Sequence, residues 1–199
     1  MDRNDVCRAW DEISETYAER RDPGGSDAAL IEDLLAACPP DPVVLDVGCG
    51  DGARTLANLP TGSLGLDISR EGLELADDTV PAARLLQGGM TAIPLAASTV
   101  DAITAYHAVF HVPRGEHPGV YGEFARVLKS GGTLLMTLPG GRFETVRRGW
   151  MGGSMLFSAP GREATLDQLR TAGFRNVRTE TVTDPLGSSS GFVFTDLDG

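Results

Sequence analysis

The sequence predicts an α/β fold of the Rossmann type, a doubly wound sheet of seven strands that is mostly parallel and carries helices on both faces. Three observations support this prediction. Short apolar runs alternate with helical segments along the 199 residues. One apolar run, residues 43–47, leads directly into a glycine-rich turn. The last two runs are joined by a Gly-Ser-rich turn, which indicates a hairpin and hence one antiparallel C-terminal strand.

The apolar runs and the helical spacing place each element. Runs bounded by Gly, Pro, Asp or Ser predict strands at residues 43–47, 63–66, 82–86, 100–106 and 133–138, followed by the hairpin strands at 177–182 and 191–195. Apolar residues at helical spacing predict helices at 5–21, 27–38, 53–59, 70–78, 118–129 and 163–172. The strand-helix repeat requires crossover connections, so a ligand is expected at the carboxyl ends of parallel strands.

Composition limits the class of protein. A chain of 199 residues fits one domain, and its 28 acidic and 17 basic residues give a net charge of −11. An acidic chain without a basic run has little to neutralise phosphates, so we expect no nucleic-acid partner. The acid excess fits a solvated surface, which a high-salt habitat would favour. The three cysteines are scattered, so we expect reduced thiols. The N-terminus is charged and no apolar run is long enough for a membrane span, so we expect a cytoplasmic protein.

The glycine-rich turn is the most informative segment. Residues 43–52 read VVLDVGCGDG, so Gly48, Gly50 and Gly52 let the backbone approach a ligand closely. Asp46 places a carboxylate inside the strand, where a charge needs a partner. Acidic side chains near this turn favour binding of S-adenosylmethionine, which carries a positively charged ammonium and a positively charged sulfonium. They would repel the pyrophosphate of a dinucleotide, and the spacing is G-x-G-x-G rather than G-x-G-x-x-G.

A second carboxylate follows the next strand. Asp67 ends the run Leu64–Asp67 and lies where a carboxylate accepts hydrogen bonds from both ribose hydroxyls. The alternative is a helix cap before Ser69, a frequent role for Asp after a strand.

With these motifs the chain resembles the class I S-adenosylmethionine-dependent methyltransferases, particularly the small-molecule group that includes quinone-biosynthesis enzymes (methyltransferase type 11). The resemblance rests on residues 44–52, 65–69, 92–95, 100–103 and 126–134. It implies that Asp46 and the turn with Gly48, Cys49, Gly50 and Gly52 hold the methionine part of the cofactor. It further implies that Asp67 holds the ribose and Ile68 packs on the adenine.

The loop after the third strand departs from the family pattern. The resemblance places Met90 and Thr91 against the adenine edge, where main-chain groups contact the base. Many relatives have an acidic residue where this chain has Gly89, and that residue accepts a hydrogen bond from the adenine amino group. Gly89 has no side chain to do so, and a lost buried hydrogen bond costs on the order of 1 kcal/mol.

Candidate catalytic residues follow the fourth strand, where the family presents side chains to the transferred methyl group. These are Tyr106, His107 and His111, with His111 the strongest candidate for a general base. The alternative for each histidine is packing or a structural hydrogen bond. Tyr17 on the first helix is expected to cover the sulfonium through a cation-π contact, with core packing as its alternative.

Two further segments complete the expectations. Residues 1–40 are expected to form N-terminal helices over the cofactor, and residues 139–160 a lid or substrate wall rather than an ordinary packed loop. The candidate lid residues are Trp150, Met151, Met155 and Phe157. We expect no metal and a monomer or homodimer. The alternatives to methyl transfer to a small molecule are a non-catalytic cofactor-binding regulatory module and a nicotinamide-dependent oxidoreductase.

Overall fold

A computed structural model describes residues 1–21, 25, 28–183 and 189–199, in which a seven-stranded sheet has the order β3-β2-β1-β4-β5-β9-β8. The five N-terminal strands are parallel, and β9 is antiparallel to both β5 and β8. The predicted fold class is therefore confirmed, including the antiparallel C-terminal strand. Part of the predicted Gly-Ser-rich turn, residues 184–188, lies outside the described residues. The strands are β1 (Val44–Val47), β2 (Leu64–Asp67), β3 (Arg84–Gln87), β4 (Val100–Ala105), β5 (Leu128–Thr137), β8 (Phe174–Thr183) and β9 (Ser189–Leu197).

Five of the predicted helices form at the expected places. They are α1 (Arg3–Arg20), α2 (Ala28–Ala36), α3 (Arg70–Thr79), α4 (His117–Val127) and α5 (Arg162–Thr171), and short 3-10 turns occur at η2 (Val109–His111) and η3 (Arg114–Glu116). The helix expected at 53–59 is wrong, because this segment contains only the 3-10 turn η1 (Leu56–Asn58). The hydroxyl of Thr55, which precedes it, donates to Asp46 instead of capping a helix.

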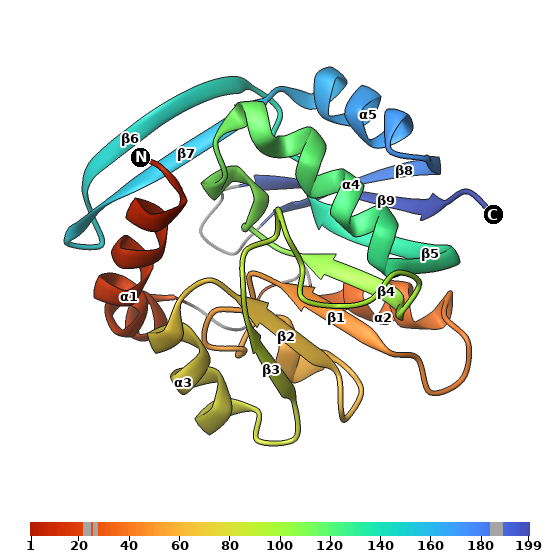
Figure 1. Cartoon of the computed structure of the whole chain (residues 1–199), viewed down its shortest axis with the longest axis horizontal. Coiled ribbons are helices and arrows are strands. Elements are labelled where there is room, and N and C mark those ends of the chain that lie inside the picture. Colours follow the sequence, from red (N-terminus) through yellow and green to blue (C-terminus); the bar gives the residue numbers. More distant parts are fainter. Residues whose placement is uncertain (22–24, 26–27, 184–188) are drawn as a thin grey trace.

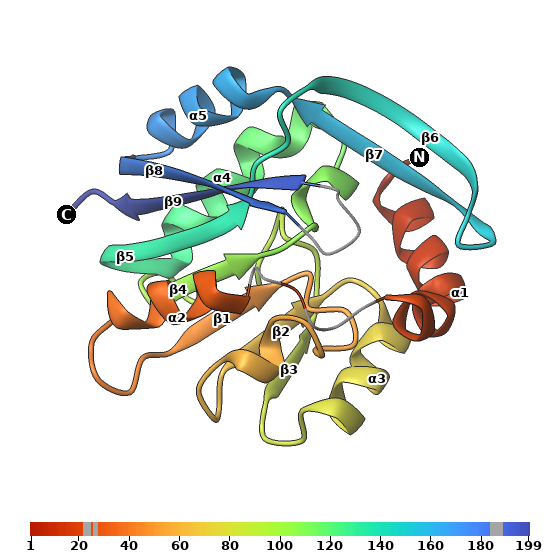
Figure 2. The same cartoon turned by 180° about the vertical axis from the view of Figure 1, so that it is seen from behind.

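Alternate residues of the central strands face two separate cores. Leu45 of β1 and Ile103 of β4 pack with residues of α4 and α5 on one face. Their neighbours Val44 and Ala102 pack with Leu30, Ile31 and Leu34 of α2 on the other. Figures 1 and 2, seen from opposite sides, show α4 in front of the sheet in one view and α2 in front in the other. This burial on both faces explains why the central strands are almost entirely apolar.

Residues 139–160, predicted as a lid or substrate wall, form a two-stranded antiparallel hairpin of β6 (Arg142–Trp150) and β7 (Gly153–Pro160). The hairpin extends beyond the main sheet toward α1 (Figures 1 and 2). Its residues Met155, Leu156 and Phe157 form a small core with Val6 and Ile13 of α1. The glycine-rich composition thus reflects turns at both ends of a hairpin that holds α1 in place.

The strand order reverses beside β1, since β2 lies on one side of it and β4 on the other. In open α/β sheets the crevice for a ligand forms at such a switch point, at the carboxyl ends of the strands. The glycine-rich turn directly follows β1, so the fold places it in this crevice.

Candidate cofactor and substrate site

A cavity occupies the switch point, with roughly 1040 Å³ of empty space including its open mouth. The lining combines the ends of β1, β2 and β4, the loop after β3 and one side of α1. Among the predicted site residues it includes Tyr17, Gly48, Cys49, Gly50, Asp67, Ile68, Gly89, Met90, Thr91, Tyr106, His107 and His111.

The turn after β1 needs glycine for steric and conformational reasons. Gly48, Gly50 and Gly52 have φ values of +74°, +53° and +75°. A Cβ on Gly48 would lie 2.4 Å from the Cβ of Ala108, which is far inside contact distance. Gly48 and Gly50 line the cavity, whereas Gly52 does not and instead turns the chain beneath it. We expected Gly52 to help hold the methionine part of the cofactor, but this residue does not line the cavity.

Asp46, which we expected to help hold the methionine part of the cofactor, is fully buried and lies outside the cavity lining. Its two carboxylate oxygens accept hydrogen bonds from the hydroxyls of Thr55 and Thr104, the latter at 2.8 Å. Burial raises the pKa of Asp46 to about 6, although both hydroxyl hydrogen bonds oppose the increase. Asp46 thus ties the glycine turn to β4 and supplies negative charge from below the cavity floor.

Asp67 lines the cavity at the end of β2. Its carboxylate accepts the main-chain N–H of Gly50 at 2.8 Å and that of Ser69 at 2.8 Å. These bonds join β2 to the glycine turn, and burial still raises the pKa of Asp67. The alternative role of Asp67 was a helix cap before Ser69. Asp67 does accept the Ser69 N–H, but the cap of α3 is Ser69 itself, whose hydroxyl accepts the Gly72 N–H. Main-chain donors therefore hold both carboxylate oxygens of Asp67 at the edge of the cavity.

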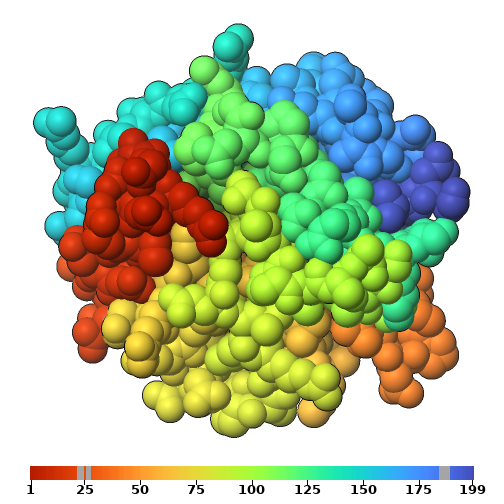
Figure 3. Space-filling view, viewed as in Figure 1, coloured from red at the N-terminus to blue at the C-terminus, as the bar shows by residue number. Residues whose placement is uncertain are grey.

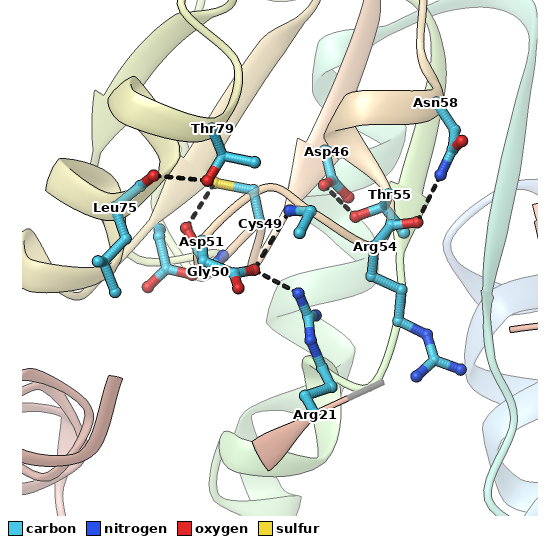
Figure 4. A network of polar contacts seen from close by, with 12 residues as sticks. Arg21, Asp46, Cys49, Gly50, Asp51, Arg54, Thr55, Asn58, Leu75 and Thr79 are labelled. Atoms are coloured by element: carbon cyan, nitrogen blue, oxygen red, sulfur yellow. Dashed lines mark hydrogen bonds and ion pairs between the residues drawn. The ribbon is translucent and has the colours of Figure 1, made fainter. Parts of the chain in front are cut away.

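Helix α1 closes one side of the cavity with aromatic and cationic side chains. The rings of Trp10 and Tyr17 meet edge to face with centroids 5.3 Å apart, and both residues line the cavity. Arg21 forms a largely buried ion pair with Asp51, and Figure 4 shows it reaching the glycine turn from the side opposite Thr55. The Nε of Arg21 is buried and has no hydrogen-bond partner among the described residues. This nitrogen is thus a buried donor without an acceptor, on a residue that lines the cavity.

The β4 side brings the three candidate catalytic residues together. Tyr106, His107 and His111 all line the cavity, and His107 has a left-handed φ of +52°. A non-glycine residue in that region often marks a functional site, and His is among the residues that tolerate it. Val112, Pro113 and Glu116 continue the wall. These three residues were not predicted from the sequence, because they belong to a loop without a recognisable motif.

His111 is a poor proton acceptor. Its Nδ1 lies 2.8 Å from the Leu156 carbonyl, which only accepts hydrogen bonds, so Nδ1 carries the proton and Nε2 is left as the acceptor. Burial lowers the pKa of His111 to about 4. The imidazole also contacts the rings of Trp10 and Phe157. It is therefore neutral at physiological pH, and its pKa is far from the value that suits a general base.

None of the four predicted lid residues lines the cavity. Trp150 packs behind the cavity wall, with its ring 5.7 Å from Trp10 and 5.8 Å from Tyr17. Met151 lies beside the same small core, Met155 is fully buried in it, and Phe157 is stacked against Phe110. The hairpin thus contacts the residues that face the ligand, and its expected role as a direct substrate wall does not match this geometry.

Comparison with known proteins agrees with the fold and the turn. A family model described as "Methyltransferase domain" matches residues 45–136, from β1 to β5. Sterol 24-C-methyltransferase erg-4 of Neurospora crassa is 35% identical over 103 residues, which are 47% of this chain and 27% of that protein. The chain therefore spans about a quarter of the length of this curated relative.

Solved structures match over almost the whole chain. A 1,6-didemethyltoxoflavin-N1-methyltransferase of Burkholderia thailandensis has a TM-score of 0.73 and 16% identity, covering 99% of this chain and 87% of that one. The [4+2]-cyclase SpnF has a TM-score of 0.75 and 17% identity, covering 99% of this chain and 96% of that one. Likeness at this identity concerns the fold, which hosts more than one activity. In the match over residues 45–136 and in its seven-stranded fold, this chain is similar to the S-adenosylmethionine-dependent methyltransferases.

Proposed function

We propose that this chain transfers a methyl group from S-adenosylmethionine to a small-molecule acceptor. The observation that carries the proposal is the cavity at the switch point, where the Gly48–Gly50 turn, the Asp67 carboxylate and the aromatic side of α1 converge. When bound, S-adenosylmethionine supplies an activated methyl group on a positively charged sulfur. The remaining chemistry depends on how these residues hold, orient and shield the reactants.

The lining fits each part of this cofactor. Gly48 and Gly50 line the cavity with main-chain atoms alone, and the Cβ position of Gly50 has no atom within 4 Å, which suits close approach of the amino-acid part. The unpartnered Nε of Arg21 suits a carboxylate, and Asp67 suits two vicinal hydroxyls. The loop at residues 88–91 and Ile68 remain for the base. Trp10 and Tyr17 offer ring faces and edges that exclude water near a cation.

The acceptor is expected on the β4 side, against Tyr106, His107 and the loop that carries Glu116. With its low pKa, His111 serves to accept a hydrogen bond and to position an acceptor rather than to store a proton. Alignment and exclusion of water can together supply roughly 7 to 11 kcal/mol, so a dedicated base is not required. Acceptors of the size of a sterol or a bicyclic heterocycle, which the compared methyltransferases are named for, fit this proposal.

Net charge and helix lengths bear on the substrate class and on the location of the protein. The net charge of −11 argues against a nucleic-acid substrate, and we propose a cytoplasmic monomer or homodimer. No helix within the described residues is both long and apolar enough to cross a bilayer.

The test combines binding with turnover. Calorimetry should detect binding of both S-adenosylmethionine and S-adenosylhomocysteine. When the protein is incubated with S-adenosylmethionine and a panel of small acceptors, at least one acceptor should be methylated and S-adenosylhomocysteine should be formed. Asp67→Asn should weaken both ligands at least tenfold, whereas Asp101→Asn should not, since Asp101 pairs with Lys129 away from the cavity. No affinity for either ligand would refute the proposal. Tight binding without turnover on any acceptor would instead favour the non-catalytic module, and stabilisation by NAD or NADP would favour the oxidoreductase.

A further inference from the structure

The base-facing side of the cavity has an unusual set of polar groups. Along the switch point, Asp67 of β2 marks the ribose position, so the base lies toward the neighbouring loop after β3. Besides main-chain groups, the polar side chains of the lining on this side are those of Asp67, Thr91 and Arg3. Asp67 accepts two main-chain N–H groups and is assigned to the ribose. The base therefore meets one hydroxyl and one guanidinium.

Arg3, which the motif analysis did not identify, lies directly over Gly89. A Cβ built on Gly89 would be 2.8 Å from Nε, 2.9 Å from Cζ and 2.9 Å from Nη2 of Arg3. Because these three atoms are almost equidistant from that point, the guanidinium lies flat across the glycine. Figure 3 shows the red N-terminal surface meeting the yellow-green surface of the segment that follows β3. The glycine thus gives Arg3 the space that any side chain would occupy.

The Arg3 side chain has no hydrogen bond and no ion pair with another residue in the described part of the chain. It is the first residue of α1, and it is exposed at the cavity rim. A guanidinium only donates hydrogen bonds. Its five N–H groups are consequently available to an acceptor on a bound ligand.

Two main-chain carbonyls on the same side already accept hydrogen bonds. The Gly89 carbonyl already accepts the Ala92 N–H at 3.0 Å. The Ile68 carbonyl accepts the Cys7 thiol at 3.3 Å and the Gln87 side-chain amide at 3.4 Å. The Thr91 hydroxyl can donate or accept, so it does not discriminate. Among the described side chains that line this part of the cavity, Arg3 is therefore the one that donates hydrogen bonds without accepting any.

We propose that Arg3 recognises the base by donating hydrogen bonds, and that the cofactor site accordingly accepts a 6-oxopurine in place of adenine. This inference rests on the proposed function, because it concerns the same cofactor site. Adenine carries a donor amino group at position 6, while hypoxanthine carries an acceptor oxygen there. A carboxylate at position 89 would favour the amino group and repel the oxygen. Gly89 with Arg3 above it removes that preference.

The test compares S-adenosylhomocysteine with S-inosylhomocysteine by calorimetry. Wild-type protein should bind the two within about fivefold of each other. Arg3→Ala should weaken the inosyl ligand at least tenfold and the adenosyl ligand less than threefold. Gly89→Asp should make the adenosyl ligand preferred more than tenfold. Gly89→Ala, whose Cβ would displace the Arg3 guanidinium without adding an acceptor, should weaken the inosyl ligand as Arg3→Ala does and change the adenosyl affinity less than threefold.

Arg8→Ala is the matched control, because Arg8 is an exposed arginine of the same helix that pairs with Asp5 and does not line the cavity. It should change neither affinity, and melting curves should show that every variant is folded. Rejection of the inosyl ligand by wild-type protein that binds the adenosyl ligand would overturn the inference and leave the proposed function intact. Equal effects of Arg3→Ala on both ligands would also overturn it. Failure of wild-type protein to bind either ligand would refute the proposed function itself.

Discussion

The buried carboxylate of Asp46 makes cofactor affinity depend on pH. Asp46 lies beneath the glycine turn with two hydroxyl partners and no cation in direct contact among the described residues. Burial raises its pKa to about 6. A positively charged sulfonium bound above the turn favours the ionised form of this side chain. We therefore predict that S-adenosylmethionine binds more weakly as the pH falls through 6.

The size of the effect follows from the pKa. About nine-tenths of the Asp46 side chains are ionised at pH 7 and about one-tenth at pH 5. A ligand that binds mainly the ionised form loses about tenfold in affinity between these values. S-adenosylhomocysteine lacks the sulfonium charge but shares the ribose, base and amino-acid groups, so it should lose much less. The ratio of the two affinities isolates the contribution of the sulfonium.

The assay is calorimetric titration of both ligands from pH 5 to pH 8 at constant ionic strength. In Asp46→Asn the ratio of the two affinities should no longer change with pH, whereas Asp101→Asn should behave as wild type. An Asp46→Asn protein that keeps the pH dependence, or a wild-type ratio that is constant from pH 5 to pH 8, would refute this reasoning.

The same carboxylate predicts a cost in stability. Because the pKa of Asp46 is higher in the folded chain than its ordinary value of 3.8, its contribution favours folding at low pH and is lost as the pH rises through about 6. The shift corresponds to about 3 kcal/mol. Unliganded Asp46→Asn should therefore unfold at a higher urea concentration than wild type at pH 7, and this difference should disappear near pH 4.

Three further predictions concern the turn, the buried histidine and the hairpin. Gly48→Ala should destabilise the fold by roughly 2 to 5 kcal/mol, because of left-handed backbone strain and overlap with Ala108, and it should abolish cofactor binding. Gly140→Ala is the control, since its Cβ would meet no atom within 4 Å. In melting and binding assays this control should show neither effect. His111→Gln should leave the shape of the pH-rate profile between pH 6 and 9 unchanged, because the histidine is already neutral there; a lost inflection would restore it as a general base. Trp150→Ala should lower both the melting temperature and the affinity for S-adenosylhomocysteine, because Trp150 supports two cavity-lining rings; an effect confined to the acceptor KM would contradict this.

The fold could be predicted from local patterns because strand and helix spacing each reflect one buried face. The run at 43–47 and the helix at 70–78 have strong patterns and clear boundaries, and both formed. The helix at 53–59 did not form, since Thr55 bonds to Asp46 and this long-range contact decides its conformation. The apolar residues at 139–160 predicted a lid or substrate wall, but they gave no indication of which partner would cover them, and in the fold that partner is α1.

The site was predictable as a list of residues but not as a set of contacts. Glycines with left-handed φ values and acids after apolar strands are features that local chemistry imposes, so the sequence by itself determined the turn, Asp67 and the position of the cavity. Only the tertiary structure decided that Asp46 acts from beneath the floor, that His111 is neutral and that Arg3 covers Gly89. These depend on residues up to 86 positions apart being packed together, and burial and electrostatic environment are properties of that packing.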